Sequence, residues 1–416
     1  MYEDVRNYPL HQIFSKNLIF LMLSLIIFSG CDKELSEIDE NKVLRKISAQ
    51  EQEIIHSNNQ LSLDILRAEY QLNQNENVLF SPLSVGISLG MVYNGVGEKE
   101  KSEIQQLLGL ESLAEKEINK SYNELLSFLQ VSYNELNISY ANSLWFSQDI
   151  NIHEDFRTRV MAYYDAEVSE LNFKKSSSLE IINSWGNMKS NGSFEKLIDV
   201  TPLKNTEIFL VNAFSLNSDW KQKDNYFQSK RDFYTYKGEK FKVDMIQWDG
   251  LNIKLNENSN YDFMEIPFEN DQFSFAVIQP ENQESLSKVM ESISIDELDH
   301  LIDNSMEYKA NVSLPHINFY SDRPLKNVLS SIGLKDLFLS TTDLSPAFIE
   351  KNKKISEINH LARINLKSNE YSIRMEDSFA DSNLKLVNIN RPFLYFIRDK
   401  HSKTVLFAGY YTQPGK

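Results

Sequence analysis

The sequence predicts an α+β fold formed by one large domain. Segments with helical patterns come first along the folded region, mixed segments follow, and strand-like runs dominate the end. No long Gly-, Ser- or Pro-rich linker and no internal repeat interrupts the chain after residue 60. A mixed fold accommodates a single domain of about 350 residues.

Composition narrows the possible partners. The chain carries 43 Lys and Arg against 59 Asp and Glu residues, a formal net charge of −16. Nucleic-acid-binding proteins present a basic face, so this balance argues against a nucleic-acid partner. With 25 Phe and 19 Tyr residues the chain can fill a sizeable core. Cys31 is the only cysteine, which excludes a disulfide within the chain and a cysteine-based zinc site.

The N-terminus is predicted to be a targeting segment. Lys16 precedes an apolar run over 18–28, which has the length of a signal-peptide core and is shorter than the roughly 20 residues that span a bilayer. Small residues and then Cys31 follow, as in a bacterial lipobox. We therefore predict a signal peptide over 1–30 and lipidation at Cys31. The alternative is an ordinary signal peptide or short anchor in which Cys31 has no role.

Lipidation would hold an exported protein at a membrane surface of the bacterial cell envelope, on the periplasmic face or at the cell surface. Residues 31–57 are polar and charged, with little apolar periodicity, and are predicted to be a flexible acidic tether. The folded domain is predicted over 58–416.

A buried helix is predicted near the start of the domain. Ser81 is a good N-cap and Pro82 is favoured at the first helical position. The following residues are apolar on nearly every side, so the helix should be buried. Gly86 and Gly90, four residues apart, would allow close backbone approach, and Gly95 would help to end the helix.

Strand-like patterns follow along the rest of the chain. They lie at 138–146, 207–216, 261–268, 273–280, 311–320, 392–399 and 404–411. Helical stretches between them lie at 178–191 and 323–338.

No catalytic pattern is present. The chain lacks a G-x-S-x-G elbow, a P-loop and an H-E-x-x-H motif, and its seven histidines show no close metal-ligand pairing. We therefore predict that the protein is not an enzyme and has neither a metal site nor a cofactor.

Several segments together resemble one family. They lie, in the family's order, at 77–110, 141–146, 182–198, 209–220, 313–338 and 390–414. On these the chain is identified as a member of the serpin (serine protease inhibitor) superfamily, and the targeting segment indicates a bacterial lipoprotein. The resemblance implies three β-sheets surrounded by about eight or nine helices, with an exposed reactive-centre loop. In such proteins the cleaved loop inserts into the central sheet as an extra strand and carries the protease with it.

The resemblance also implies roles for particular residues. Ser81, Ser84, Asn212 and His360 match the shutter, the polar cluster under the centre of the sheet. The alternative is a buried polar cluster without a regulatory role. Trp220 matches the breach, where insertion begins.

The hinge departs from the family pattern. Serpin hinges use small residues, a Gly followed by several Ala, because they must pass quickly between two strands. The matching stretch at 368–377 has no glycine and no alanine run. Its residues are Ser368, Asn369, Glu370, Tyr371, Ser372, Ile373, Arg374 and Met375.

Alternation leaves two interpretations of this stretch. Tyr371, Ile373 and Met375 share one parity and polar residues share the other, which is typical of a strand. The segment is either able to lie in the central sheet, partly inserted or inserting slowly, or it is a loop that has drifted after losing an inhibitory role.

The reactive bond has two candidate positions, because the segment is shorter than in typical inhibitors. Counting forward from the hinge gives Leu384–Lys385, which we prefer because an apolar residue suits a chymotrypsin- or elastase-like pocket. Counting back from Pro392 gives Asp381–Ser382.

We predict a monomeric serine-type endopeptidase inhibitor that presents its loop to a serine (or cysteine) protease. The alternative, which the hinge favours, is a non-inhibitory binding or structural module on the same scaffold.

Overall fold

The computed structural model describes residues 44–132, 138–199, 205–221, 226–235, 237–258, 260–269, 271–281, 286–316, 318–367, 372–373 and 383–414. Within these ranges every helix is too short or too polar to cross a membrane.

The folded unit begins earlier than predicted. The chain divides into Met1–Lys46 and Ile47–Lys416, and helix α2 covers Ala49–Leu72. Ser48 caps this helix in a capping box with Glu51, each side chain accepting from the backbone N–H of the other residue. Ile54 and Ile55 are buried. The predicted tether over 31–57 is therefore too long, because the apolar residues of the first turns are too sparse among polar ones to show helical periodicity.

Helix α3 (Pro82–Tyr93) forms where the sequence predicts it. The Ser81 hydroxyl accepts from the backbone N–H of Ser84 at 3.2 Å, and every residue of the helix is buried. A Cβ on Gly86 would lie 1.7 Å from Asn58 Oδ1 of α2, so only glycine allows this approach. Glycine therefore sets the close packing of α2 on α3.

Nine α-helices lie in the described ranges, in line with the eight or nine that the resemblance implies. The others are α4 (Glu98–Leu108), α5 (Glu115–Ser132), α6 (Glu154–Tyr164), α7 (Ser177–Lys189), α8 (Leu286–Ser292), α9 (Ile295–Asp303) and α10 (Lys326–Ser331). A 3-10 turn covers Asp336–Phe338.

A five-stranded sheet forms the centre of the unit. Its order is β10 (Asn318–Pro324), β11 (Ile355–Lys367), β4 (Ile208–Asp219), β2 (Ile138–Ser147) and β3 (Ala166–Leu171). The single strand predicted over 311–320 is wrong: β9 (Met306–Pro315) ends before β10 begins, and the two belong to different sheets.

The remaining strands form one ten-stranded sheet rather than the two implied by the resemblance. Its path runs β1 (Val78–Phe80), β15 (Val405–Tyr411), β14 (Phe393–Asp399), β8 (Phe273–Pro280), β7 (Tyr261–Pro267), β6 (Lys240–Glu257), β5 (Tyr226–Tyr234) and β12 (Ser372–Ile373), with β9 pairing both β6 and β13 (Lys385–Asn388). The long strand β6 joins the two halves, because it pairs with β5 before an irregularity at Trp248/Leu251 and with β7 after it.

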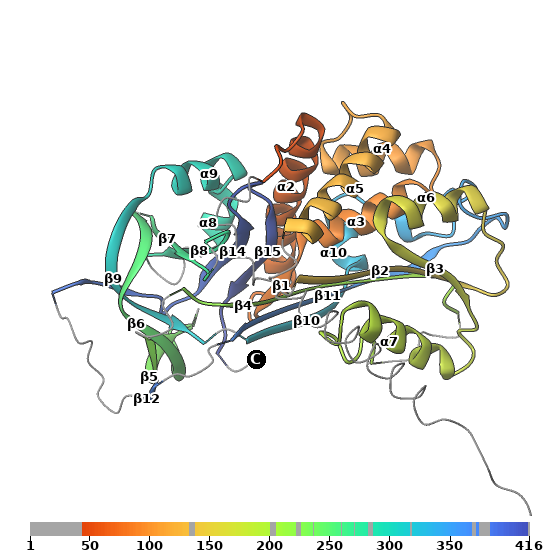
Figure 1. The fold of residues 1–416 in the computed structure, drawn as a ribbon. Coiled ribbons are helices and arrows are strands. Elements are labelled where there is room, and N and C mark those ends of the chain that lie inside the picture. Colours follow the sequence, from red (N-terminus) through yellow and green to blue (C-terminus); the bar gives the residue numbers. More distant parts are fainter. Residues whose placement is uncertain are drawn as a thin grey trace, which may run out of the picture. The chain divides into compact units, whose positions relative to one another are not determined.

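Helices cover both faces of the five-stranded sheet. Figure 1 shows α7 on one face, and α3, α5 and α6 on the other. Side chains from alternate positions of β4, such as Val211 and Ala213, pack with Ile182 of α7 in one apolar cluster. The intervening positions point to the α3 side, where Phe214 meets Phe407 of β15 with ring centroids 5.3 Å apart. The sheet centre is therefore buried on both faces.

Candidate functional site

The central sheet is closed. Strands β4 and β11 pair directly and in parallel from Ile208 and Ile355 to Asp219 and Lys367. No other strand lies between them along this length of the described chain. The last pair leaves Lys367 at the end of the sheet, immediately before the predicted hinge.

A buried polar cluster lies under the centre of the two strands. His360 of β11 stands opposite Asn212 of β4, and the two side chains are hydrogen-bonded. His360 Nε2 accepts from the backbone N–H of Ser81 at 2.9 Å, and Asn212 Nδ2 donates to the carbonyl oxygen of Ser84 at 2.9 Å. The structure thus brings together the four predicted residues, which are far apart in the sequence, and all four are buried.

The hydrogen bonds define the state of His360. The backbone N–H of Ser81 can only donate, so Nε2 carries no proton and Nδ1 donates to Asn212 Oδ1. Burial lowers the pKa of His360 from 6.5 to about 3. The imidazole is therefore neutral at physiological pH, and protonation would break its bond to Ser81.

The register extends this cluster into a row across the sheet. Asn142 of β2 stands opposite Asn212, and Arg323 of β10 stands opposite His360. Directly opposed residues point to the same face of a sheet. Asn142 Nδ2 donates to the carbonyl oxygen of Tyr164 at 3.0 Å, and Arg323 forms an ion pair with Glu69 at 3.2 Å.

Three residues of this cluster and row were not identified from the sequence: Ser88, Asn142 and Arg323. Asn212 Nδ2 also donates to Ser88 Oγ of α3. Ser88 follows Ser84 by four residues on the same helix face, a spacing that could have identified it. Asn142 and Arg323 carry no such local signal, because only strand register aligns them with His360.

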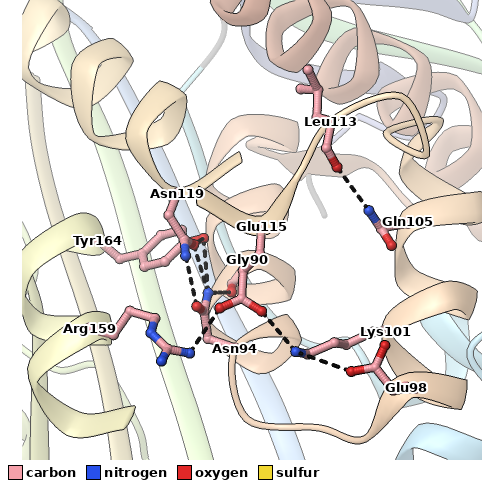
Figure 2. A network of polar contacts seen from close by, with 10 residues as sticks. All are labelled: Gly90, Asn94, Glu98, Lys101, Gln105, Leu113, Glu115, Asn119, Arg159 and Tyr164. Carbon is pink, nitrogen blue, oxygen red and sulfur yellow. Dashed lines mark hydrogen bonds and ion pairs between the residues drawn. The ribbon is translucent and has the colours of Figure 1, made fainter. Parts of the chain in front are cut away.

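A second polar network fixes the other end of α3 (Figure 2). The amides of Asn94 and Asn119 exchange hydrogen bonds of 2.7 and 2.8 Å, and Tyr164 donates to Asn119 at 2.5 Å. Close by, the Glu115 carboxylate pairs with Lys101 at 2.8 Å and Arg159 at 2.9 Å. Helices α3, α5 and α6 are thereby tied together.

Trp220 lies directly after the last residue pair of β4. It is fully buried and packs against Trp248, Phe268 and Phe275, with ring centroids 5.4, 5.1 and 5.7 Å away. Its indole Nε1 has no hydrogen-bond partner among the described residues. This end of the sheet is therefore held by aromatic packing.

The described part of the hinge lies outside the central sheet. Ser372 and Ile373 form β12, which pairs in parallel with Phe227 and Gln228 of β5 in the ten-stranded sheet. The interpretation that these two residues are inserted in the central sheet is therefore wrong, because β4 and β11 already satisfy each other there. The remaining predicted residues of the loop and anchor lie outside the described residues: Ser368, Asn369, Glu370, Tyr371, Arg374, Met375, Asp381, Ser382 and Cys31.

The preferred reactive bond lies at the start of a strand. Lys385 begins β13 and pairs with Ala310 of β9. Its ammonium group forms an ion pair with Glu257 and lies 5.3 Å from the centre of the Tyr308 ring. Both Leu384 and Lys385 are half-buried. The contacts of Lys385 hold the C-terminal side of this bond against the sheet.

In the described part of the chain, no group of three or more His, Cys, Asp or Glu side chains is placed to hold a metal ion.

Two parallel central strands close over a buried polar cluster, and the segment after one of them crosses to a second sheet. This is the arrangement of the serpin fold. The solved structure of maspin matches it with a TM-score of 0.77 at 20% identity, covering 88% of this chain and all of that one. The structure of native protease nexin-1 with heparin matches with a TM-score of 0.76 at 22% identity and 88% coverage.

The family model for Serpin (serine protease inhibitor) matches residues 56–414, and the chain belongs to the serpin family. Iripin-1 of Ixodes ricinus is 24% identical, over 85% of this chain and 93% of its own length. An uncharacterized serpin-like protein of Methanosarcina acetivorans is 25% identical over 94% and 97%. The leukocyte elastase inhibitor of Xenopus tropicalis is 26% identical over 85% and 97%.

Proposed function

We propose that this protein is a serpin-type inhibitor of a serine (or cysteine) endopeptidase, which it meets with residues 368–384. Membership of a family of protease inhibitors supports the class of target. The observation that carries the proposal is the unbroken pairing of β4 with β11, combined with the passage of the chain from Lys367 to a strand of the other sheet. A closed central sheet, with β12 paired to β5 outside it, fits the state that precedes cleavage.

The polar cluster is proposed to act as the shutter. An inserting strand must separate Asn212 from His360, and then each can bond the new strand instead. Exchange of hydrogen bonds keeps the cost of opening low, whereas apolar packing would offer no replacement partner.

The hinge is proposed to make inhibition inefficient. Ladder hydrogen bonds of an inserted strand contribute about 1 kcal/mol each. Tyr371, Ile373 and Met375 must enter where the family uses small residues, and overpacking costs about 1–3 kcal/mol per site. Insertion is then slow, and most encounters end with a cut loop and a released protease.

The contacts of Lys385 favour a cut earlier than Leu384–Lys385. A protease needs an extended, accessible segment on both sides of the bond, and β13 occupies the C-terminal side. The earlier candidate, Asp381–Ser382, is separated from Lys385 by Asn383 and Leu384. Mass spectrometry of the fragments identifies the bond.

Incubation with a panel of serine and cysteine proteases, followed by a denaturing gel, tests the proposal. We expect cleavage within 368–384, a minor covalent complex at most, and a melting temperature that changes by only a few degrees after cleavage. A rise of tens of degrees would show that the hinge inserts despite its bulk. A loop that no protease cuts would refute the protease-directed function.

A second candidate is a non-inhibitory binding module on the serpin scaffold. The pairing of Ser372 and Ile373 with β5 favours it, because it occupies hinge residues that an inhibitor must release. On the same gel, a covalent complex with any protease would exclude this second candidate, since a binding module forms none at any ratio.

We also propose export and anchoring through a lipid on Cys31. The apolar run over 18–28 and the position of the only cysteine support this. Mass spectrometry of the mature N-terminus should show an acylated Cys31. A Cys31→Ser variant that partitions equally with membranes would argue for another kind of anchor.

A further inference from the structure

A pocket lined by lysines opens beside the start of β13. It has a volume of about 410 Å³ and is formed by β6, β7 and β9, together with the segments that follow β4, β7 and β14. Four lysines line it: Lys221, Lys254, Lys309 and Lys400. Three acids share the lining: Glu265, Asp271 and Glu307. Although the chain has a net charge of −16, the lysines of this pocket outnumber its acids by one.

The charges of the pocket do not cancel. Lys221 is paired with Asp271. The other three lysines form no ion pair with any described residue. Glu265 is buried and accepts from Ser274 Oγ at 2.5 Å, and Glu307 is exposed opposite Lys254.

The pKa of Lys400 is lowered. Loss of water around its ammonium group is the largest cause; the attraction of Glu265 and Asp271 opposes it, and a weaker repulsion from Lys254 and Lys221 adds to it. An added carboxylate would offset both the loss of water and the repulsion between the lysines. The chemistry therefore suits an acidic partner.

The pocket adjoins the end of the loop. Gly250, with φ +75°, leaves room that a Cβ would fill: that atom would lie 2.7 Å from Lys309 Cε and 3.3 Å from Leu384 Cδ1. Lys309 directly precedes Ala310, the partner of Lys385 in the sheet. A protease bound to residues 368–384 would reach this place, since each partner of a protease–inhibitor complex buries about 800 Å².

We propose that this lysine-lined pocket is an accessory docking site for acidic side chains on the surface of the protease that attacks the loop. The inference rests on the proposed function. Charges at the edge of an interface act mainly on the association rate and its salt dependence. The pocket would thus select among proteases that share a cleavage specificity but differ in surface charge.

Anionic and cationic trypsin are a suitable pair of probes, because both cut after Lys and Arg and the segment contains Arg374. The measurement is the second-order rate constant for cleavage within 368–384. For the Lys254→Glu/Lys309→Glu variant we expect anionic trypsin to cleave about ten-fold more slowly at low salt, and cationic trypsin to be unaffected or faster. The difference should vanish at about 0.5 M salt.

A Lys116→Glu/Lys120→Glu variant is the matched control. It changes the net charge equally, on α5, which lies on the far side of the unit from β6 and β9 (Figure 1). We expect less than a two-fold effect. A neutral Lys254→Gln/Lys309→Gln variant, with a smaller effect in the same direction, guards against misfolding of the charge-reversed protein.

Equal rates for the pocket and control variants would overturn the inference while leaving the proposed function intact. Stabilisation by inorganic phosphate that depends on Lys254 and Lys309, without an effect on anionic trypsin, would also overturn it, since the site would then bind free anions only. If neither trypsin cuts the segment although another protease of the panel does, the proposed function stands and this inference is overturned, since the pocket then fails to recruit a protease with an acidic surface.

Discussion

The centre of the central sheet and the end where Trp220 follows β4 are held by different forces. At the centre, Asn212 takes part in directional hydrogen bonds with His360 and with α3. At the end, Trp220 is surrounded by aromatic rings and its Nε1 has no described partner. Directional bonds specify one register and can be exchanged, whereas aromatic packing resists loss of volume but tolerates small displacements.

The largest expected effect is at the aromatic end. Trp220→Ala should lower the free energy of unfolding by about 3–5 kcal/mol, because it leaves a large cavity. Trp220→Phe should cost only about 1–2 kcal/mol, since volume is partly kept and no hydrogen bond is lost. Urea denaturation measures both. Equal costs for the two variants would mean that Nε1 has a partner and that the comparison is wrong.

At the centre, polarity should matter more than volume. His360→Ala leaves the backbone N–H of Ser81 and Asn212 Oδ1 without their partner, and each buried unsatisfied group costs about 1–3 kcal/mol. We expect a loss of about 3 kcal/mol by urea denaturation. Since His360→Phe preserves volume but not polarity, a small cost for that variant would contradict this view.

His360 should also make stability depend on pH. Its pKa is lowered to about 3 in the folded state by burial, so the unfolded chain binds the proton at higher pH. The stabilisation is complete above pH 6.5 and is lost as the pH falls from 6.5 toward 3, by up to about 1.4 kcal/mol per pH unit.

A His360→Gln variant isolates this contribution. Burial also lowers the pKa of His316, which makes stability fall with falling pH in both proteins. Burial raises the pKa values of Asp322 and Glu357, which makes stability rise with falling pH in both proteins. The difference in unfolding free energy between the two proteins should therefore shrink below pH 6.5, and a constant difference would show that His360 does not titrate on unfolding.

The smallest expected changes in stability are those of alanine substitutions at the two predicted shutter serines, Ser81 and Ser84, and they should differ. Ser81→Ala removes the N-cap of α3 and should cost about 1 kcal/mol. Ser84→Ala should change stability by less than about 0.5 kcal/mol, because the Ser84 hydroxyl is buried without a described partner and the residue contributes its backbone carbonyl instead. Thermal melts of the two variants test this, and a costly Ser84→Ala would reveal a hidden partner of the hydroxyl.

Local signals in the sequence determined the buried helix over 82–93, with its serine cap and its close-packing glycines, and the positions of the strands β2, β4, β7, β8, β14 and β15. The family's order of motifs further identified Ser81, Asn212 and His360 as one site. The helix and the strands could be predicted from the sequence because capping, helical periodicity and strand alternation involve residues that are near one another in sequence.

Tertiary structure alone decided how distant segments align. Strand register places Asn142 and Arg323 in the row with His360, the continuous β6 merges two expected sheets into one, and Lys385 is held in β13 beside the lysine-lined pocket. Such pairings depend on which faces and edges remain unsatisfied after the whole chain has packed. These pairings therefore depend on all the elements together and could not be predicted from any single segment of the sequence.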